Sequence, residues 1–263
     1  MLSALSPQRR RLLIVSAALT ALTLVAVVLL LRTQSEPPPR ASGPVPVVLV
    51  HGFGGDSSAM AAIQARLQRE GLQVTSVDLP GGGIGDITES AGTVAAAVEA
   101  TRSSTVDLIG FSMGGLVIRA YLEHHDGLHR ARHVVTLGSP HHGTNIAGAA
   151  AVADPGLCTG ACEQMTPGSG FLEELNEPDE TPAGPSFVTV WTSFDETVTP
   201  PETATLEGAV NVQVQSVCPT STAGHGDLPR DPMVLGLIVQ TLRGKTLTAP
   251  EPNDCQRLSR LGT

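Results

Sequence analysis

Three residues of the chain have types and an order suited to acyl transfer. Ser112 lies in Gly110-Phe111-Ser112-Met113-Gly114, Asp195 follows a predicted strand, and His225 comes late in the chain. In this chemistry a serine hydroxyl attacks a carbonyl carbon, a histidine takes the hydroxyl proton, and a carboxylate orients the imidazole. The order serine, aspartate, histidine is one of the known chain orders of such a triad.

The residues around Ser112 predict a sharp turn between a strand and a helix. Residues 105–109 are predicted to form a short strand, and residues 113–125 a helix. A serine at such a turn is held in a strained backbone conformation with its hydroxyl projecting above the sheet. Gly110 and Gly114 carry no side chains that would clash with the adjoining strand and helix. A glycine-rich turn with an incidental serine is the alternative.

A second glycine-rich segment, His51-Gly52-Phe53-Gly54-Gly55, follows the first predicted strand. Acyl transfer needs backbone N–H groups aimed at the oxygen that becomes negative, and one such donor contributes about 3–4 kcal/mol in known sites. We expect these donors to be the N–H groups of Phe53 and Met113, with Gly52 letting the loop turn inward. His51 precedes the serine, so its predicted role is to order this loop.

Three residues are alternatives to the predicted acid and base. His141 and His142 follow the fourth predicted strand and could line the pocket or replace His225 as base. Glu196 is adjacent to Asp195 and could replace it as the acid. The position of His225, on a loop between the last strand and the closing helix, favours it over both other histidines.

Short apolar segments alternate with helix-length segments after residue 44. This alternation predicts an α/β fold with a mostly parallel central sheet and helices on both faces. The last predicted strand alternates apolar with polar residues, which is typical of an edge strand. The predicted strands are residues 46–50, 73–78, 105–109, 133–137, 187–192 and 210–217, and the predicted helices are residues 56–70, 86–102, 113–125 and 228–242.

Residues 139–186 interrupt this alternation. The segment is rich in Gly, Ala and Pro and lacks strong periodicity. A stretch of this length inside a compact domain is usually a functional insertion. We therefore predict one catalytic domain over residues 45–263, with a cap-like or lid-like insertion at about 139–186.

The four cysteines, Cys158, Cys162, Cys218 and Cys255, are an even number, which suggests two disulfides in an exported protein. Cys158 and Cys162 enclose three residues, so a local bridge is the first choice, leaving Cys218 to pair with Cys255. A metal site is the competing interpretation, but no histidine stands at ligand spacing beside these cysteines. We predict no metal and no organic cofactor.

The first 32 residues have the pattern of a membrane segment. Three arginines at 9–11 precede a charge-free run from Leu12 to Leu31, which Arg32 closes. Twenty residues span about 30 Å as a helix, the thickness of the hydrocarbon core. The arginines favour a cytoplasmic N-terminus and an uncleaved signal-anchor. A cleaved signal, which would give a secreted protein, and a buried core helix are the alternatives. Residues 33–44 predict a Pro-rich linker.

Charge and composition exclude some partners. The net charge is -9, and because residues 1–40 carry +4, the remainder carries -13. Aromatic residues make up 3% of the chain. An acidic domain with few aromatic side chains is unsuited to nucleic acid, so we expect no such partner. The predicted partners are a lipid or small ester substrate and a membrane, and the protein is expected to be a monomer in an extracytoplasmic location.

Five motifs in order resemble the class 2 lipase family of the α/β-hydrolase superfamily. They are His51-Gly52-Phe53-Gly54-Gly55, Gly110-Phe111-Ser112-Met113-Gly114-Gly115, Leu137-Gly138-Ser139-Pro140-His141-His142-Gly143-Thr144, Ser193-Phe194-Asp195 and Gly224-His225. The resemblance covers roughly residues 45–243. It implies a compact α/β-hydrolase that cleaves fatty-acyl or short-chain esters with Ser112, Asp195 and His225 as the triad.

Two features depart from the smallest members of that family: the membrane-length leader and the insertion with Cys158 and Cys162. Two other functions remain open. A thioesterase or a cell-envelope acyl-ester hydrolase would use the same triad on a different bond. A non-catalytic binding protein on a hydrolase scaffold is the non-enzymatic alternative, and it usually lacks a triad member, whereas none is missing here.

Overall fold

The computed structural model describes residue 8 and residues 43–154, 156, 158–244 and 248–263. The chain divides into two units, residues 1–41 and 42–263, and all elements named below belong to the second. The predicted membrane segment and most of the Pro-rich linker lie outside the described residues. Within the described ranges, no helix has the length and apolar character needed to cross a bilayer.

The core of the second unit is a six-stranded sheet in which every neighbouring pair is parallel. Its order is β2-β1-β3-β4-β5-β6. All four residues of β1 are fully buried, as expected of a central parallel strand covered on both faces. The strands are β1 (Val47–Val50), β2 (Val74–Val77), β3 (Val106–Phe111), β4 (Ala131–Leu137), β5 (Ser186–Trp191) and β6 (Val210–Gln213).

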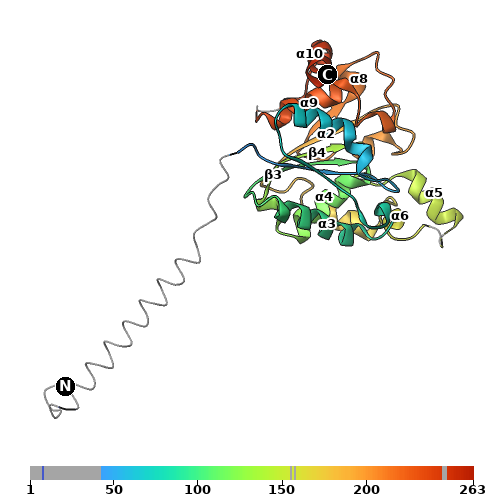
Figure 1. The fold of residues 1–263 in the computed structure, drawn as a ribbon. Helices are drawn as coiled ribbons and strands as arrows, with labels where there is room; N and C mark the ends of the chain where they lie inside the picture. The colour runs from blue at the N-terminus through green and yellow to red at the C-terminus, as the bar shows by residue number, and fades with distance from the viewer. Residues whose placement is uncertain (1–7, 9–42, 155, 157, 245–247) are drawn as a thin grey trace, which may run out of the picture. The chain divides into compact units, whose positions relative to one another are not determined.

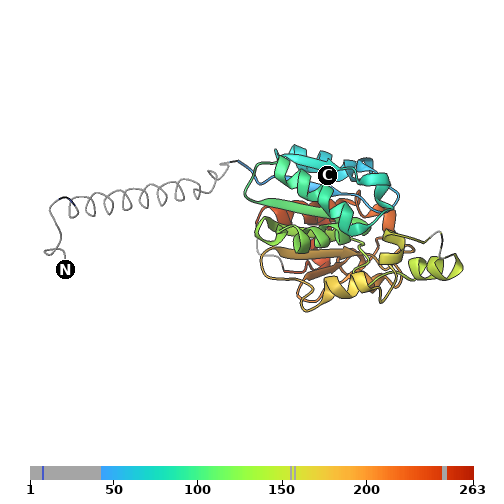
Figure 2. The same cartoon turned by 90° about the horizontal axis from the view of Figure 1, so that it is seen from below.

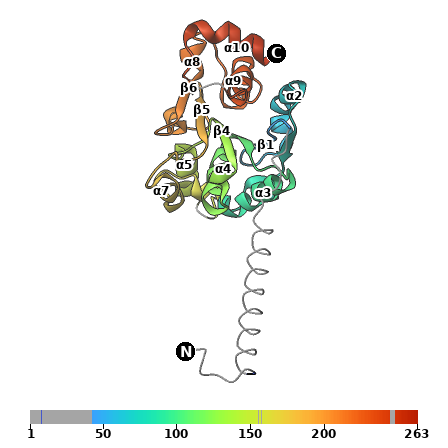
Figure 3. The same cartoon turned by 90° about the vertical axis from the view of Figure 1, so that its left-hand side faces the viewer.

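Helices cover both faces of this sheet (Figures 1 and 3). On one face lie α3 (Ile87–Ala100) and α4 (Met113–His124), which pack against Val48 and Val50 of β1. On the other face lie α2 (Ala61–Arg69) and α9 (Pro232–Leu242). These helices pack against Val47 and Leu49, the side chains of β1 that point to the opposite face from Val48 and Val50. The predicted α/β architecture is therefore confirmed for the sheet and its two helical layers.

The strand order places a topological switch point between β1 and β3. The chain runs from β1 outward to β2 and then returns to form β3 on the other side of β1. In open α/β sheets the ligand crevice lies at the carboxyl ends of the strands where the order reverses. The glycine-rich loop after β1 and Ser112 after β3 both lie at this point.

Two predicted boundaries were wrong. The predicted strand 210–217 is β6 (Val210–Gln213) followed by the one-turn helix α8 (Val214–Val217). The reason is that Val214 and Val217 are both buried, a spacing of three that suits a helical turn, whereas Ser216 is exposed. The closing helix α9 begins at Pro232 rather than 228, because the Asp231 carboxylate caps it and accepts from two backbone N–H groups.

The insertion contains three short helices, α5 (Asn145–Ala153), α6 (Ala161–Gln164) and α7 (Gly170–Asn176). Helix α5 extends from one side of the body (Figure 2). A further helix, α10 (Cys255–Gly262), packs on α9 and was not predicted. Short 3-10 turns complete the elements: Ser57–Met60, Pro80–Gly83, Gly127–His129, Pro201–Ala204, His225–Asp227 and Pro252–Asp254.

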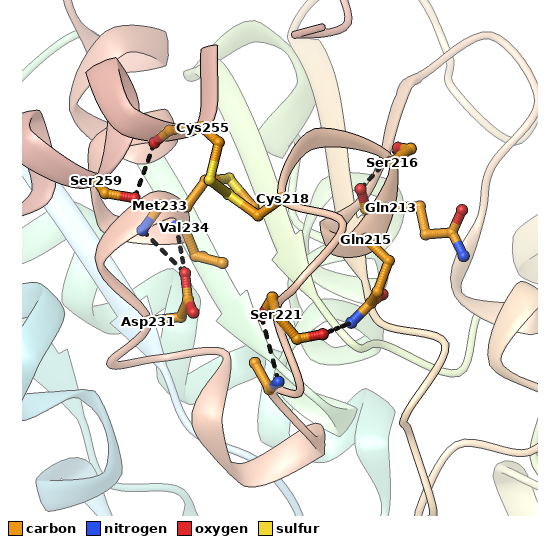
Figure 4. The surroundings of a disulfide bond; sticks show 11 residues. Gln213, Gln215, Ser216, Cys218, Ser221, Asp231, Met233, Val234, Cys255 and Ser259 are labelled. Atoms are coloured by element: carbon orange, nitrogen blue, oxygen red, sulfur yellow. Dashed lines mark hydrogen bonds between the residues drawn. A yellow bond between two sulfur atoms is a disulfide. The ribbon is translucent and has the colours of Figure 1, made fainter. Parts of the chain in front are cut away.

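Both predicted disulfides are present, and the four cysteines form no metal site. Cys158 pairs with Cys162 between α5 and α6, with Cα atoms 5.1 Å apart. Cys218, at the end of α8, pairs with Cys255 at the start of α10, also with Cα atoms 5.1 Å apart. Figure 4 shows this second bridge beside Gln215 and Ser221. It attaches the C-terminal helix next to the segment that leads to His225.

Candidate active site

Ser112 occupies the turn between β3 and α4, as predicted. Its backbone has φ 55° and ψ -130°, outside the regions that residues with a side chain normally occupy. The turn is held by the Ser112 N–H, which donates to the Leu137 carbonyl at 2.8 Å. Such strain persists only where the surroundings enforce it, and it is concentrated at functional sites. Ser112 is 9% exposed, so its hydroxyl lies at the floor of a recess.

The three motif glycines are required by close packing around this turn. A Cβ on Gly52 would lie 2.8 Å from Ser112 Cβ. A Cβ on Gly110 would lie 2.5 Å from the Gly115 nitrogen, and one on Gly114 would collide with the Val50 carbonyl oxygen. The contacts at Gly110 and Gly114 are with backbone atoms, which cannot move aside, and the contact at Gly52 is with the Cβ of Ser112 itself. The glycines therefore allow β1, β3 and α4 to approach closely enough to form the turn.

Asp195 and His225 are brought together by the loops after β5 and α8. His225 Nδ1 lies 2.7 Å from Asp195 Oδ2, and the side chains are 12% and 1% exposed. The other carboxylate oxygen of Asp195 accepts from the N–H groups of Thr197 and Val198 at 2.9 and 2.7 Å. An ionised carboxylate can only accept hydrogen bonds, so His225 Nδ1 carries the proton and donates it to Asp195 Oδ2, which leaves Nε2 unprotonated in the neutral imidazole.

A small hydrogen-bond network ties the two loops to each other. Thr192 Oγ1 donates to the Ala223 carbonyl at 2.6 Å, and Gln215 Nε2 donates to Thr192 Oγ1 at 2.9 Å. Phe194 and Gly224 add a parallel bridge between the same loops. This network positions Asp195 against His225. Sequence reasoning missed it, because single threonine and glutamine residues carry no recognisable signal.

The two predicted oxyanion donors lie on different elements, Phe53 on the loop after β1 and Met113 at the start of α4. The Phe53 N–H makes no hydrogen bond to another described residue, and Met113 is the first residue of α4, where amides have no partner within the helix. His51 is fully buried. Its Nε2 accepts from the Leu79 N–H at 3.0 Å, which places the proton on Nδ1, bonded to the Gly52 carbonyl at 2.7 Å. This agrees with the loop-ordering role predicted for it.

An apolar cavity of about 370 Å³ opens over these residues. Ser112 and His225 both line it, and the Phe111 ring packs against the His225 imidazole with ring centres 4.9 Å apart. The insertion supplies one side of the wall. The remaining lining residues are Gly52, Phe53, Pro140, Thr144, Ile146, Ala147, Ala150, Cys162, Met165, Thr197 and Val198.

The three alternative residues lie away from this arrangement. His141 is fully buried, bonded to Thr136 Oγ1 at 3.0 Å, and burial holds its pKa well below the usual value. His142 contacts Glu180 at 2.7 Å. Neither histidine lines the cavity, contrary to the expectation that they could. Glu196 is exposed, and the carboxylate bonded to His225 is that of Asp195.

Gly138, at the end of β4, lies directly beneath the Asp195–His225 pair. Its φ is 54°, and a Cβ there would lie 3.0 Å from His225 Nδ1 and 3.2 Å from Asp195 Oδ2. Any side chain at this position would press on both partners. The sequence places Gly138 in a recognisable motif but does not reveal this contact, because it depends on the packing of β4 against two distant loops.

Gly138→Ala is expected to lower kcat for ester hydrolysis about tenfold to hundredfold, because a small displacement of a reacting group is enough for such a loss. Gly71→Ala is the matched control: Gly71 also has positive φ, 77°, but no atom lies within 4 Å of its Cβ position. Both variants carry similar backbone strain. Steady-state kinetics and thermal midpoints of both variants would distinguish an effect on the active site from general backbone strain. Equal losses of kcat in the two variants would contradict the positioning role of Gly138.

A family model and a known enzyme match parts of this chain. Residues 46–170, slightly less than half of the chain, match a family model described as palmitoyl protein thioesterase. The chain is 36% identical over 100 residues to pyrrolizixenacetamide deacetylase of Xenorhabdus hominickii. That alignment covers 35% of this chain and 37% of the deacetylase, so the chain matches well under half of that protein.

Solved lipase structures share the fold. Lipase B of Aspergillus fumigatus superimposes with a TM-score of 0.65 and 19% identity, covering 86% of this chain and 64% of the lipase. Lipase BlEst2 of Bacillus licheniformis, in its propeptide form, superimposes with a TM-score of 0.65 and 20% identity. The superposition covers 82% of this chain and 54% of that lipase. The chain thus spans less than two thirds of either lipase. It has the α/β-hydrolase fold.

Proposed function

We propose that the protein is a serine ester hydrolase of the lipase and carboxylesterase type, in keeping with its resemblance to class 2 lipases. One observation carries the proposal: Ser112 and His225 line a single apolar cavity, and His225 is hydrogen-bonded on its far side to a buried carboxylate. This is the arrangement in which a serine hydroxyl becomes a nucleophile and a carboxylate orients its base.

In the first half of the proposed reaction, His225 Nε2 takes the Ser112 proton while Ser112 Oγ bonds to the ester carbonyl carbon. The carbonyl oxygen becomes negative and accepts hydrogen bonds from the Phe53 and Met113 N–H groups, with further stabilisation by the N-terminus of α4. The C–O bond to the alcohol then breaks, and the His225 imidazolium returns its proton to the departing oxygen. The acyl group remains on Ser112.

In the second half, a water molecule replaces the alcohol. His225 takes a proton from the water as its oxygen bonds to the acyl carbon, and the same N–H groups hold the negative oxygen. The bond to Ser112 Oγ breaks, Ser112 regains its proton from His225, and the carboxylic acid leaves. Asp195 remains ionised and stabilises the imidazolium in both halves. These steps draw only on side chains and backbone groups of this chain, and on water.

The substrate we propose has an apolar acyl chain, and residues 139–186 form much of the acyl-binding wall. The large hydrophobic side chains that are exposed among the described residues support the proposal that this substrate comes from a lipid phase. They form what we call the apolar collar: Phe53, Ile84, Ile146, Val152 and Phe194. Phe53 and Ile146 also line the cavity. No charged residue occurs between Gly143 and Ala153, which include all of α5. Exposed apolar side chains at the rim of a cleft, such as Phe53 and Ile146, often mark a contact with lipid.

A thioesterase is the second candidate, and the match of residues 46–170 to the palmitoyl protein thioesterase family model favours it. The proposed groups would attack a thioester in the same way. The location also stays a proposal: the two disulfides favour an oxidising, extracytoplasmic compartment, and residues 1–32 would tether the protein to a membrane unless a signal is cleaved.

A panel of matched esters tests this function. Ethyl acetate, ethyl butyrate and ethyl hexanoate differ only in acyl length, and S-ethyl thiobutyrate replaces the bridging oxygen with sulfur. Each CH₂ that enters the cavity contributes about 0.8 kcal/mol, so we expect kcat/KM to rise about fourfold per CH₂ until the cavity is filled. A decrease with acyl length would contradict the assignment of the cavity. A thioester preferred tenfold over its oxygen ester would favour the thioesterase.

Val152→Glu tests the apolar collar. Val152 is 86% exposed on α5, so the variant should fold normally. We expect it to reduce hydrolysis of emulsified tributyrin about threefold or more, because a charge would replace an apolar contact with the lipid, and to leave soluble ethyl butyrate unaffected. Ala96→Glu, on the exposed side of α3, is the control. Equal rates for both variants on the emulsion would contradict the role of the collar.

A further inference from the structure

A second cavity lies on the other side of His225. It is an open cleft of about 560 Å³ between the loop after β5 and the loop that carries His225. His225 and Thr197 line both this cleft and the apolar cavity, whereas Ser112 lines only the apolar one. The imidazole therefore stands between two spaces of different chemistry. The cleft's other lining residues are Ser193, Phe194, Asp195, Glu196, Thr222, Gly224, Gly226 and Asp227.

The lining of this cleft is polar and available for hydrogen bonding. Three hydroxyl groups in the lining, those of Ser193, Thr197 and Thr222, make no hydrogen bond to another described residue. Ser193 and Thr197 form hydrogen bonds only with their backbone groups. The Glu196 carboxylate likewise has no partner among the described residues. Only Phe194 contributes a large apolar surface. The cleft suits a ligand with several hydroxyl groups, which can both donate and accept.

The fixed charges of the cleft are negative. Glu196 is exposed, and the Asp227 side chain is about half exposed and accepts from the Gly224 N–H at 3.0 Å. Asp195 is neutralised by its bond to His225 when the imidazole is protonated. Among the residues that the structure describes, no lysine or arginine lines the cleft. The nearby Arg230 donates to the Gly226 carbonyl and lies 3.5 Å from Asp227. An anionic ligand would meet like charge there.

The chemistry of the proposed reaction assigns a role to each space. The acyl chain leaves Ser112 last and belongs in the apolar cavity. The alcohol must depart past His225, because this residue returns the proton to its oxygen. We propose that the polar cleft binds the alcohol part of the ester and selects alcohols that are polyhydroxylated and carry no negative charge. This inference rests on the proposed function and specifies its substrate class.

Three butyrate esters that share the acyl group test the proposal: 1-butyrylglycerol, 1-butyrylglycerol 3-phosphate and propyl butyrate. The full-length protein is expected to cleave the glycerol ester with a kcat/KM about tenfold above that of the phosphate ester, and above that of propyl butyrate. In Glu196→Gln the preference for the glycerol ester over its phosphate should fall about threefold, as expected when one exposed charge is removed. This preference is measured as the ratio of the two kcat/KM values, and the substitution should leave the thermal midpoint unchanged.

Glu202→Gln is the matched control, because Glu202 is an exposed glutamate that lines neither cavity. It should retain the full preference. Equal kcat/KM for the two glycerol esters, or the same loss of preference in both variants, overturns the proposal. Hydrolysis of p-nitrophenyl butyrate by the same preparation distinguishes failure of the cleft proposal from failure of the proposed function. Ester hydrolysis without a glycerol preference refutes the cleft alone, and no hydrolysis of any ester contradicts the proposed function beneath it.

Discussion

Ser112→Ala is expected to lower kcat for p-nitrophenyl butyrate by at least about 10⁴-fold, while KM changes little. The hydroxyl is the group that bonds to the carbonyl carbon, and the remaining donors and cavity can supply only a small part of the rate enhancement. The substitution removes one oxygen from a side chain that is 9% exposed, so the fold should be kept. The thermal midpoint checks this directly.

Ser193→Ala is the control for this variant. Ser193 is an exposed serine on the loop after β5 and lines the polar cleft but not the apolar cavity. Loss of its hydroxyl should change hydrolysis of this aromatic ester less than tenfold. If Ser112→Ala hydrolysed the ester at the parent rate, Ser112 would not be the nucleophile, and the interpretation of the strained turn would be wrong.

Asp195→Asn is expected to lower kcat about 10⁴-fold, the second large effect. The amide is isosteric, but an NH₂ group facing His225 Nδ1 favours the tautomer with its proton on Nε2, where it cannot accept the serine proton. One carboxylate oxygen already accepts two backbone N–H groups, so the amide oxygen should stay there and leave the NH₂ toward His225. The loss should appear in kcat rather than KM and should shrink at high pH, where hydroxide can act as base.

Asp126→Asn makes the same chemical change at an exposed position on a loop before β4 and should leave the rate unchanged. Glu196→Gln distinguishes the alternative acid. A 10⁴-fold loss in Glu196→Gln together with a small loss in Asp195→Asn would show that the wrong carboxylate had been assigned to His225.

The parts of the site that follow local rules could be predicted from the sequence. Ser112 required only a strand, a sharp glycine-flanked turn and a helix, and these are recognisable within about fifteen residues. The disulfide pairing was predictable because Cys158 and Cys162 enclose only three residues, which favours a local bridge and leaves Cys218 to pair with Cys255. The strand order, which places the loop after β1 next to Ser112, was not among these predictions.

The parts that depend on contacts between distant segments could not be predicted. Gly138 belongs to a recognisable motif, but the sequence does not show that a Cβ there would press on His225 and Asp195, which come from two distant loops. The alternation at 210–217 suggests one strand, but burial of Val217 continues the chain as α8. His141 resembles a pocket residue in sequence, whereas burial against Thr136 removes it from the cavity. The polar cleft lies between two loops that are far apart in sequence and are joined by the hydrogen bond from Thr192 to Ala223.

The central claim is that Ser112 carries the acyl group, and covalent labelling with a fluorophosphonate tests it most directly. Such a reagent phosphonylates a serine only when a neighbouring base activates it. Intact-protein mass spectrometry followed by peptide mapping should find one phosphonyl group per chain, on Ser112, with ester hydrolysis lost in proportion and no label on Asp195→Asn in the same time. A preparation that hydrolyses esters but is labelled at another residue, or not at all, would contradict the account.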